Sequence, residues 1–291
     1  MKKNNIYVST TFTPDNTPLS FTMNLCEENG LDCIEIGSNH CYENNYDFIK
    51  DYQLNFLVHN YFPIPKKSFV VNIASFDEEI RKMSIDHIRK AINLCDQIGA
   101  KLYTFHPGFL TDPDGSNIDN KNYDFQWDDK KLRNSNFEKA TSIMYESLNE
   151  IIYFSKSKNI KVAIETEGSV SKKNHLLMQR PIEYRMLMQK FNSDDIGINL
   201  NIGHLNLASK AFNFDKRYFI DLIEDYIVAM ELSHNEGHED DHLPLKEGEW
   251  YWDTITNKKF CDVLKILECR NTSVNQIAEN IKLIVNKINA V

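Results

Sequence analysis

The segment from Val228 to His242 has the residue types of a metal site. It begins as a short apolar run, and between Glu231 and His242 it places three histidines and five carboxylates around one glycine. Such an apolar run is typical of a buried strand, and functional residues are common on the loop that leaves a strand. Imidazole and carboxylate groups suit divalent metals such as zinc, manganese and iron. Asp240 and His242 project to the same side of an extended backbone, although the segment alone fits a solvated acidic loop equally well.

The same residue types recur at the ends of other predicted strands. Six consecutive predicted strands finish in a residue that can bind a metal or move a proton: His59, His106, Glu165, Asn201 with His204, Glu231 and Glu268. A single histidine or glutamate at a strand end is usually structural. Six in succession favour a metal site, in which carboxylates neutralise the ion and imidazoles fix its geometry. A carboxylate left over could act as a general acid or base.

Strand-like runs and helical patterns alternate along the chain. We predict strands at 6–9, 33–37, 55–60, 102–106, 161–165, 197–201, 227–233 and 262–268. Helices are predicted from a cap at Thr17 to Gly30, from Ser75 to Gly99, after a capping box at Ser135, near 182–191, near 215–224 and after a capping box at Ser273. The β–α alternation predicts parallel strands. Eight such units in 291 residues predict an α/β fold, a single-domain (β/α)8 TIM barrel over residues 1–291.

A doubly wound open sheet is the alternative fold, but no Gly-x-Gly-x-x-Gly follows the first predicted strand. In a barrel the carboxyl ends of the strands meet at one rim, where the chemistry of this fold takes place. The strand-end histidines and carboxylates would then share that rim. Two long polar connections, 107–134 and 234–261, leave strand ends. We predict that both lie over the rim and are mobile without a ligand.

The composition narrows the classes of partner. The chain is 42% hydrophobic and 26% charged, as in ordinary soluble proteins. A net charge of −9 without a basic block disfavours nucleic acid and anionic membranes as partners. The N-terminal residues lack the apolar core of a signal peptide, and no apolar run approaches the roughly 18 residues of a membrane span. The six cysteines lack Cys-x-x-Cys pairing and are expected to be reduced thiols in a cytoplasmic protein. The oligomeric state stays open, a homo-oligomer included.

Several short motifs together resemble the xylose isomerase-like TIM-barrel superfamily, which includes sugar phosphate isomerases and epimerases and endonuclease IV. The motifs are Phe105-His-Pro-Gly108, Ile164-Glu-Thr-Glu-Gly168, Asn201-x-x-His204, Asp240-x-His242 followed by Pro244-Leu-Lys-Glu-Gly248, and Leu267-Glu268. The resemblance covers nearly the whole chain. Resemblance to the three-metal arrangement of endonuclease IV implies one ion at His59, His106 and Glu165, and another at His204, Asp240 and His242. It implies a shared central ion at Glu165, Asn201, Glu231 and Glu268.

Two residues depart from the pattern of this superfamily. Asn201 stands where the family usually has an aspartate, and Glu231 stands where it usually has a histidine. Asparagine offers a neutral carbonyl, which is a weaker ligand than a carboxylate, whereas Glu231 adds a negative charge. The resemblance therefore implies an altered central site. It leaves open the identity of the ion, among zinc, manganese, cobalt and magnesium, and the number of ions, from one to three.

The resemblance implies a metal-dependent isomerase or epimerase acting on a small-molecule sugar or sugar phosphate. Glu165 and Glu268 match the paired glutamates that move the substrate proton in sugar-isomerising relatives, through a metal-stabilised enediolate. The predicted substrate-binding residues are His59, His106, His234, Trp250 and Arg270. The alternatives are an endonuclease IV-like phosphodiesterase on abasic DNA, another metal-assisted reaction such as dehydration or hydrolysis, and a non-catalytic carbohydrate-binding barrel. No cluster of basic residues suited to gripping DNA accompanies the ligand positions.

Overall fold

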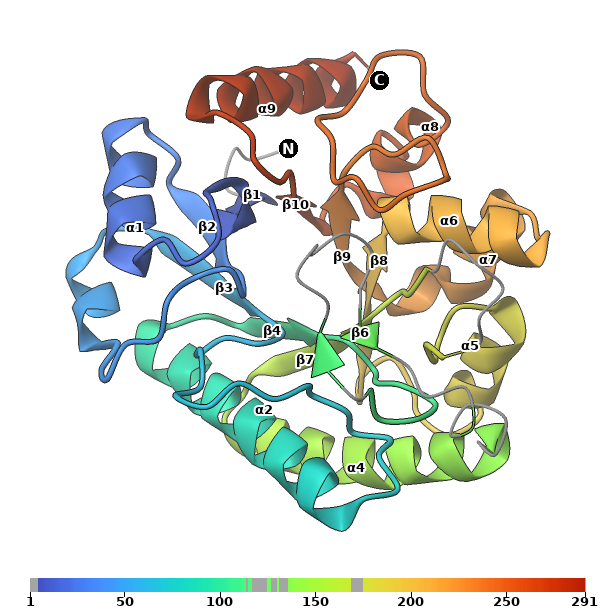
Figure 1. The fold of residues 1–291 in the computed structure, drawn as a ribbon. Coiled ribbons are helices and arrows are strands. Elements are labelled where there is room, and N and C mark those ends of the chain that lie inside the picture. The colour runs from blue at the N-terminus through green and yellow to red at the C-terminus, as the bar shows by residue number, and fades with distance from the viewer. Residues whose placement is uncertain are drawn as a thin grey trace.

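The strands close into a barrel that is surrounded by helices (Figure 1). The structure is a computed structural model, and it describes residues 5–113, 115–116, 125–126, 130, 136–168 and 175–290. The barrel strands are β1 (Ile6–Ser9), β2 (Cys33–Ile36), β3 (Asn55–His59), β4 (Leu102–Phe105), β7 (Lys161–Glu165), β8 (Gly197–Asn201), β9 (Ile227–Leu232) and β10 (Leu264–Leu267). They pair in the order β1-β10-β9-β8-β7-β4-β3-β2, and every pair is parallel. The predicted (β/α)8 TIM barrel is confirmed.

The helices lie outside the barrel and follow its strands (Figure 1). They are α1 (Leu19–Glu28), α2 (Glu78–Ile98), α4 (Phe137–Ser157), α5 (Pro181–Met188), α6 (Ile202–Phe212), α7 (Lys216–Ile223), α8 (Trp252–Ile255) and α9 (Val274–Asn289). Short 3-10 turns occur at Thr10–Phe12, Asp47–Asp51, Glu224–Tyr226 and Lys258–Phe260. Helix α2 shows why these segments are helical: the Asp77 side chain caps its first turn, and Gly99 ends it in the left-handed conformation with φ 77°. None of the helices in the described part of the chain is both long and apolar enough to span a bilayer.

The predicted strands all correspond to barrel strands, and their bounds differ by two residues or fewer. The helix starts need correction. Helix α1 begins one residue after Pro18, which occupies the cap position predicted for Thr17. Helix α4 is capped by Asn136, whose side chain accepts from the Lys139 backbone N–H at 3.0 Å, whereas Ser135 lies outside the described residues. Helix α6 was not predicted, because it follows β8 without a linker.

Strand periodicity divides the barrel interior into an apolar and a polar layer. Successive inward side chains on one strand are two residues apart. One buried apolar cluster contains Leu57, Leu102, Ala163, Ala229 and Ile266. The next inward positions on the same strands, toward the carboxyl rim, are His59, Thr104, Glu165, Glu231 and Glu268. The same pleat that fills the base of the barrel with apolar side chains therefore presents polar ones at the rim.

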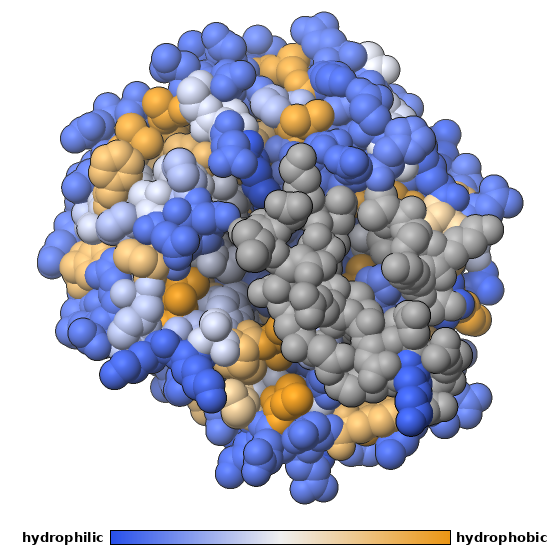
Figure 2. Space-filling view, in the orientation of Figure 1, coloured by the Kyte–Doolittle hydropathy of each residue, from blue (hydrophilic) through white to orange (hydrophobic). Residues whose placement is uncertain are grey.

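The long connections predicted over the rim differ in how much of them is described. The segment 234–261 leaves the end of β9, pairs His234 with Leu243 in an isolated bridge, and carries α8 before the chain enters β10. Of the segment 107–134, the structure describes residues 107–113 and 130 and an antiparallel pair of β5 (Gly115–Ser116) and β6 (Phe125–Gln126). On the face drawn in Figure 2, hydrophilic side chains dominate and the apolar ones are scattered.

Candidate metal centre

Three neighbouring strands bring together His59, His106 and Glu165, here called the first triad. His59 ends β3, His106 follows β4 directly, and Glu165 ends β7. His59 Nε2 lies 3.6 Å from Glu165 Oε2, and one donor atom each of His59, His106 and Glu165 lies within 4.8 Å of the others. Ligands of a tetrahedral ion with bonds of about 2.1 Å lie roughly 3.4 Å apart, so this spacing suits donors that surround an ion. Within the described chain, Glu165 Oε2 is buried without a hydrogen-bond partner.

A second triad is formed by His204, Asp240 and His242. His204 lies in the first turn of α6, and the other two lie on the connection after β9. His204 Nε2 is 3.3 Å and His242 Nε2 is 3.0 Å from Asp240 Oδ2. The backbone of His204 passes so close to Gly168 that a Cβ there would overlap its carbonyl oxygen. In each triad, one donor atom per residue lies within 4.8 Å of the others, so either triad could hold an ion.

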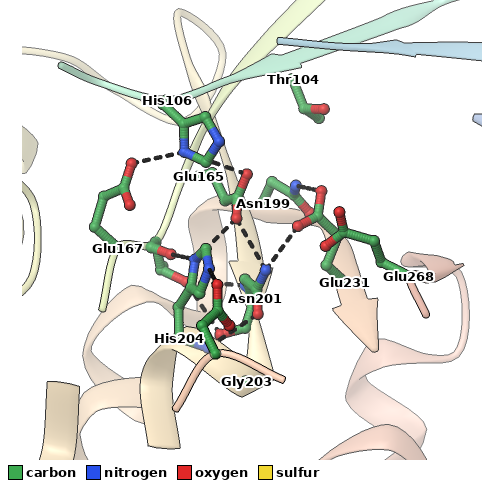
Figure 3. Close-up of polar contacts among 12 residues, drawn as sticks. Thr104, His106, Glu165, Glu167, Asn199, Asn201, Gly203, His204, Glu231 and Glu268 are labelled. Atoms are coloured by element: carbon green, nitrogen blue, oxygen red, sulfur yellow. Dashed lines mark hydrogen bonds and ion pairs between the residues drawn. The ribbon is translucent and has the colours of Figure 1, made fainter. Parts of the chain in front are cut away.

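Glu165 connects the two triads (Figure 3). Its Oε2 faces the first triad, and its Oε1 lies 3.0 Å from His204 Nδ1 in the second. Next to it, the Asn201 amide nitrogen donates to Glu165 Oε1 and to Glu231 Oε2, both at 2.9 Å. Glu268 stands at the other side of the site, where its Oε2 is 3.1 Å from His242 Nδ1. The strand-end residues singled out from the sequence therefore form one connected polar network.

The network holds more carboxylates than its imidazoles can balance. Burial raises the pKa of Glu231 and of Glu35, which lies on β2, well above the ordinary value, and the charges of Glu165 and Glu268 add to this effect. Burial acts in the same direction on Glu165 and Glu268, but neighbouring histidines outweigh it and lower both pKa values. For Glu268, His242 and then Arg270 bring the pKa to about 2. Glu165 and Glu268 are therefore ionised, whereas Glu35 and Glu231 favour their protonated forms. Cations at the rim would reduce the repulsion among these four carboxylates.

The donor set fits divalent transition metals. Each triad offers two imidazoles and one carboxylate, a mixture that suits zinc, manganese or cobalt better than magnesium, which prefers oxygen ligands. The residues are also held in place before any ion binds, since the side chains of His59, Glu165, His204 and His242 are all nearly inaccessible to solvent. When bound, a divalent ion would supply the positive charge that polarises a substrate oxygen.

Two further residues of the site, Glu167 and Thr104, were not assigned a role from the sequence. Glu167 Oε1 accepts from His106 Nδ1 at 2.7 Å, and Thr104 Oγ1 lies 2.8 Å from His59 Nδ1. Histidines that bind metals usually use their second ring nitrogen in such contacts, which fix the tautomer and the ring orientation. Glu167 sits two residues after Glu165 in Glu-Thr-Glu, and Thr104 faces inward two residues before His106, so a period-two reading of both strands could have found them.

Removing the Glu167 carboxylate should weaken metal binding at the first triad. We expect Glu167→Ala to lower zinc affinity there by about 10- to 100-fold, because His106 loses the acceptor that orients its ring. Glu167→Gln keeps an acceptor oxygen and should recover most of the affinity. Competitive zinc titration with a chromophoric chelator measures both variants. Equal losses in the two variants would show that Glu167 does not act through the hydrogen bond to His106.

Zinc affinity at the second triad should rise with pH. Burial disfavours the imidazolium of His242, but Asp240 and Glu268 outweigh burial and raise its pKa to about 9. An ion binds the neutral imidazole, so below that pKa it must displace a proton, and affinity should increase about tenfold per pH unit for each displaced proton. Zinc titrations at several pH values below 9 measure the slope. Glu268→Gln removes one carboxylate that holds this proton and should shift the curve to lower pH, whereas a flat profile would contradict the assignment.

The remaining residues predicted to bind substrate lie in different surroundings. His234 is buried, and its Nε2 lies 3.2 Å from Glu236 Oε1. Trp250 is half-buried, with Lys216 Nζ 4.5 Å from its ring centre. Arg270 is exposed after β10, and its charge lowers the pKa values of Glu268 and His242. Of these three, Arg270 is the one whose charge acts on residues of the triads and on Glu268.

The sequence and the barrel both match known proteins. A family model described as "Xylose isomerase-like TIM barrel" matches residues 23–287, which is most of the chain. The protein belongs to the xylose isomerase-like TIM barrel family. A relative from Methanocaldococcus jannaschii, the uncharacterised protein MJ1614, is 25% identical over 236 residues, which cover 81% of this chain and 78% of the relative. The predicted resemblance is confirmed at the level of the family.

Solved structures share the barrel at low sequence identity. A D-tagatose 3-epimerase-like protein superposes with a TM-score of 0.72 at 18% identity, covering 98% of each chain. Endonuclease IV from Thermus thermophilus superposes with a TM-score of 0.61 at 11% identity, covering 99% of this chain and all of the other. Proteins named as an epimerase-like protein and as an endonuclease thus share this barrel, and the fold alone does not choose between the two activities.

Proposed function

We propose that this protein is a metal-dependent isomerase or epimerase of a small sugar or sugar phosphate. The observation that carries the proposal is the pair of ionised carboxylates, Glu165 and Glu268, in one buried network with both triads. They end β7 and follow β10, strands that are separated in the barrel by β8 and β9. The pKa of each is lowered, so each is ionised at neutral pH and has an oxygen that can accept a proton. The similarity to solved epimerases supports the same class of reaction.

The two glutamates would divide the proton transfer between them. One takes the proton from the carbon next to the substrate carbonyl, and the other must take up a proton from solvent before it returns one to the product. The two oxygens of Glu165 face the first and the second triad, so its carboxylate lies beside both candidate ion positions. Glu268 contacts His242 Nδ1, which holds its carboxylate in one orientation.

A second candidate, a metal-dependent phosphodiesterase, is favoured by the two separate triads that meet at Glu165. Two ions held on either side of one carboxylate suit an in-line displacement at phosphorus. The similarity to endonuclease IV points to abasic DNA as its substrate. The net charge of −9 favours a small substrate over nucleic acid, and for this reason we rank this function second. A barrel that binds carbohydrate without turnover is the third candidate.

Solvent-deuterium incorporation separates these functions. The protein is loaded with manganese, cobalt or zinc and incubated in deuterium oxide with a panel of ketoses, aldoses and their phosphates. An isomerase or epimerase that protonates carbon from solvent will place deuterium on carbon in substrate or product, and Glu165→Gln should not. A duplex with an abasic site is offered in parallel. Cleavage of that duplex above the Glu165→Gln background, without deuterium incorporation into any sugar, would replace the first function by the second.

A further inference from the structure

The side chain of Asn201 occupies the position between the two innermost carboxylates. Its amide nitrogen lies 2.9 Å from Glu165 Oε1 and 2.9 Å from Glu231 Oε2, so its two protons point at two different carboxylates (Figure 3). The other oxygen of Glu231 accepts from the Asn199 amide nitrogen at 2.6 Å. Both oxygens of Glu231 are therefore bound by amide donors supplied by β8. All of these side chains are buried.

The orientation of this amide is fixed by the backbone. Asn201 is the N-cap of α6, and its Oδ1 accepts from the His204 backbone N–H at 3.0 Å. Its own backbone N–H donates to Thr166 Oγ1 at 2.9 Å, which anchors the residue from the other side. A backbone N–H needs an acceptor, so rotating the amide by half a turn would set its NH2 group against the N–H of His204. The nitrogen must therefore face the carboxylates.

We infer that the Asn201 amide closes the position between Glu165 and Glu231 to a metal ion and confines bound ions to the two triads. An ion there would need carboxylate oxygens at about 2.1 Å, where the NH2 group now stands. Binding would require that group to leave, which would also break the cap of α6 and leave a buried donor unpaired. The amide protons thus take the place of a cation between the two carboxylates. Asn201 belongs to neither triad, so both triads keep all their donors.

This inference revises the expectation that Asn201 and Glu231 are ligands of a shared central ion. It rests on the metal dependence in the proposed function and not on the class of substrate. The chain should bind two divalent ions, one in each triad, with Glu165 Oε2 serving the first triad. A third group of donors, Glu35, His59 and Glu231, also lies within 4.8 Å, but it shares His59 with the first triad and both Glu231 oxygens already accept from amides. Glu231 then acts as a buried acceptor that holds the amides of Asn199 and Asn201 in place. Replacing the amide nitrogen by oxygen should open the central position.

Zinc stoichiometry and anomalous diffraction test the inference. The full chain is saturated with zinc and freed of excess metal by gel filtration. Elemental mass spectrometry then measures the number of zinc ions per chain. We expect two ions for the wild type and three for Asn201→Asp, because the aspartate still caps α6 but adds a charged ligand at the centre. Asn136→Asp is the matched control: it makes the same exchange at the N-cap of α4, which is exposed, and should bind two ions.

Crystals of the zinc-loaded wild type locate the ions even if Asn201→Asp does not fold. We expect anomalous peaks at the two triads and none in contact with the Glu231 carboxylate. A wild-type peak bound to Glu231, or a folded Asn201→Asp that holds no more zinc than the wild type, would overturn the inference. The proposed reaction can fail separately, since a chain with two correctly placed ions and no deuterium exchange on sugars would contradict that function alone.

Discussion

Glu165→Gln is expected to lower turnover by about 100- to 10,000-fold, the range for a lost general acid or base, and to weaken metal binding as well. Glu165 Oε2 faces both histidines of the first triad, and Oε1 contacts His204 and the Asn201 amide. Glutamine keeps the size of the side chain but loses its charge and its ability to take a proton. Deuterium incorporation measures the rate, and metal analysis after gel filtration measures retention.

A matched control for this change is Glu183→Gln. Glu183 is also buried, but it lies on α5 and accepts from the backbone N–H groups of Gln179 and Arg180. This exchange removes a buried carboxylate outside the site, so it should affect stability and leave metal content and turnover close to those of the wild type. Full activity together with full metal occupancy in Glu165→Gln would refute the role assigned to Glu165.

Glu268→Gln is expected to separate proton transfer from metal binding. Glu268 belongs to neither triad, and its contact is with His242 Nδ1, while His242 Nε2 faces Asp240. The variant should therefore keep both ions, and turnover should fall by about 100- to 10,000-fold, the range for a lost general acid or base. Steady-state kinetics and metal analysis of the same preparation test the two statements together. Unchanged kcat in a fully loaded variant would remove Glu268 from the mechanism.

The eight barrel strands could be predicted because their evidence is local. Each is a short apolar run bounded by polar or turn residues, and β7 (Lys161–Glu165) and β8 (Gly197–Asn201) were placed with their observed bounds. Helix α6 was missed for a physical reason as well. Asn201 is both the last residue of β8 and the N-cap of α6, so no turn or linker separates strand from helix. Helix α6 is also buried continuously from Ile202 to Ser209 and lacks the exposed polar face that marks a surface helix.

Most residues of the candidate site could also be predicted from the sequence. Histidines and carboxylates at successive strand ends need only the barrel topology to share a rim. The motif resemblance divided six of them into two of the three groups that the structure brings within 4.8 Å. Which groups face one another inside that rim could not be read from spacing. Glu167 pairs with His106 rather than with a helix, and Glu268 pairs with His242, because strands far apart in sequence set those distances.

Asn201 shows most clearly what could not be predicted from the sequence. The sequence determined that an amide stands among buried carboxylates on the carboxyl rim, and it suggested a weak metal ligand. Only the tertiary structure decided which end of that amide faces the carboxylates, because the His204 backbone N–H takes the oxygen and leaves the nitrogen for Glu165 and Glu231. Donor and acceptor directions depend on every partner around a buried group, and those partners come from β7, β8, β9 and α6 at once.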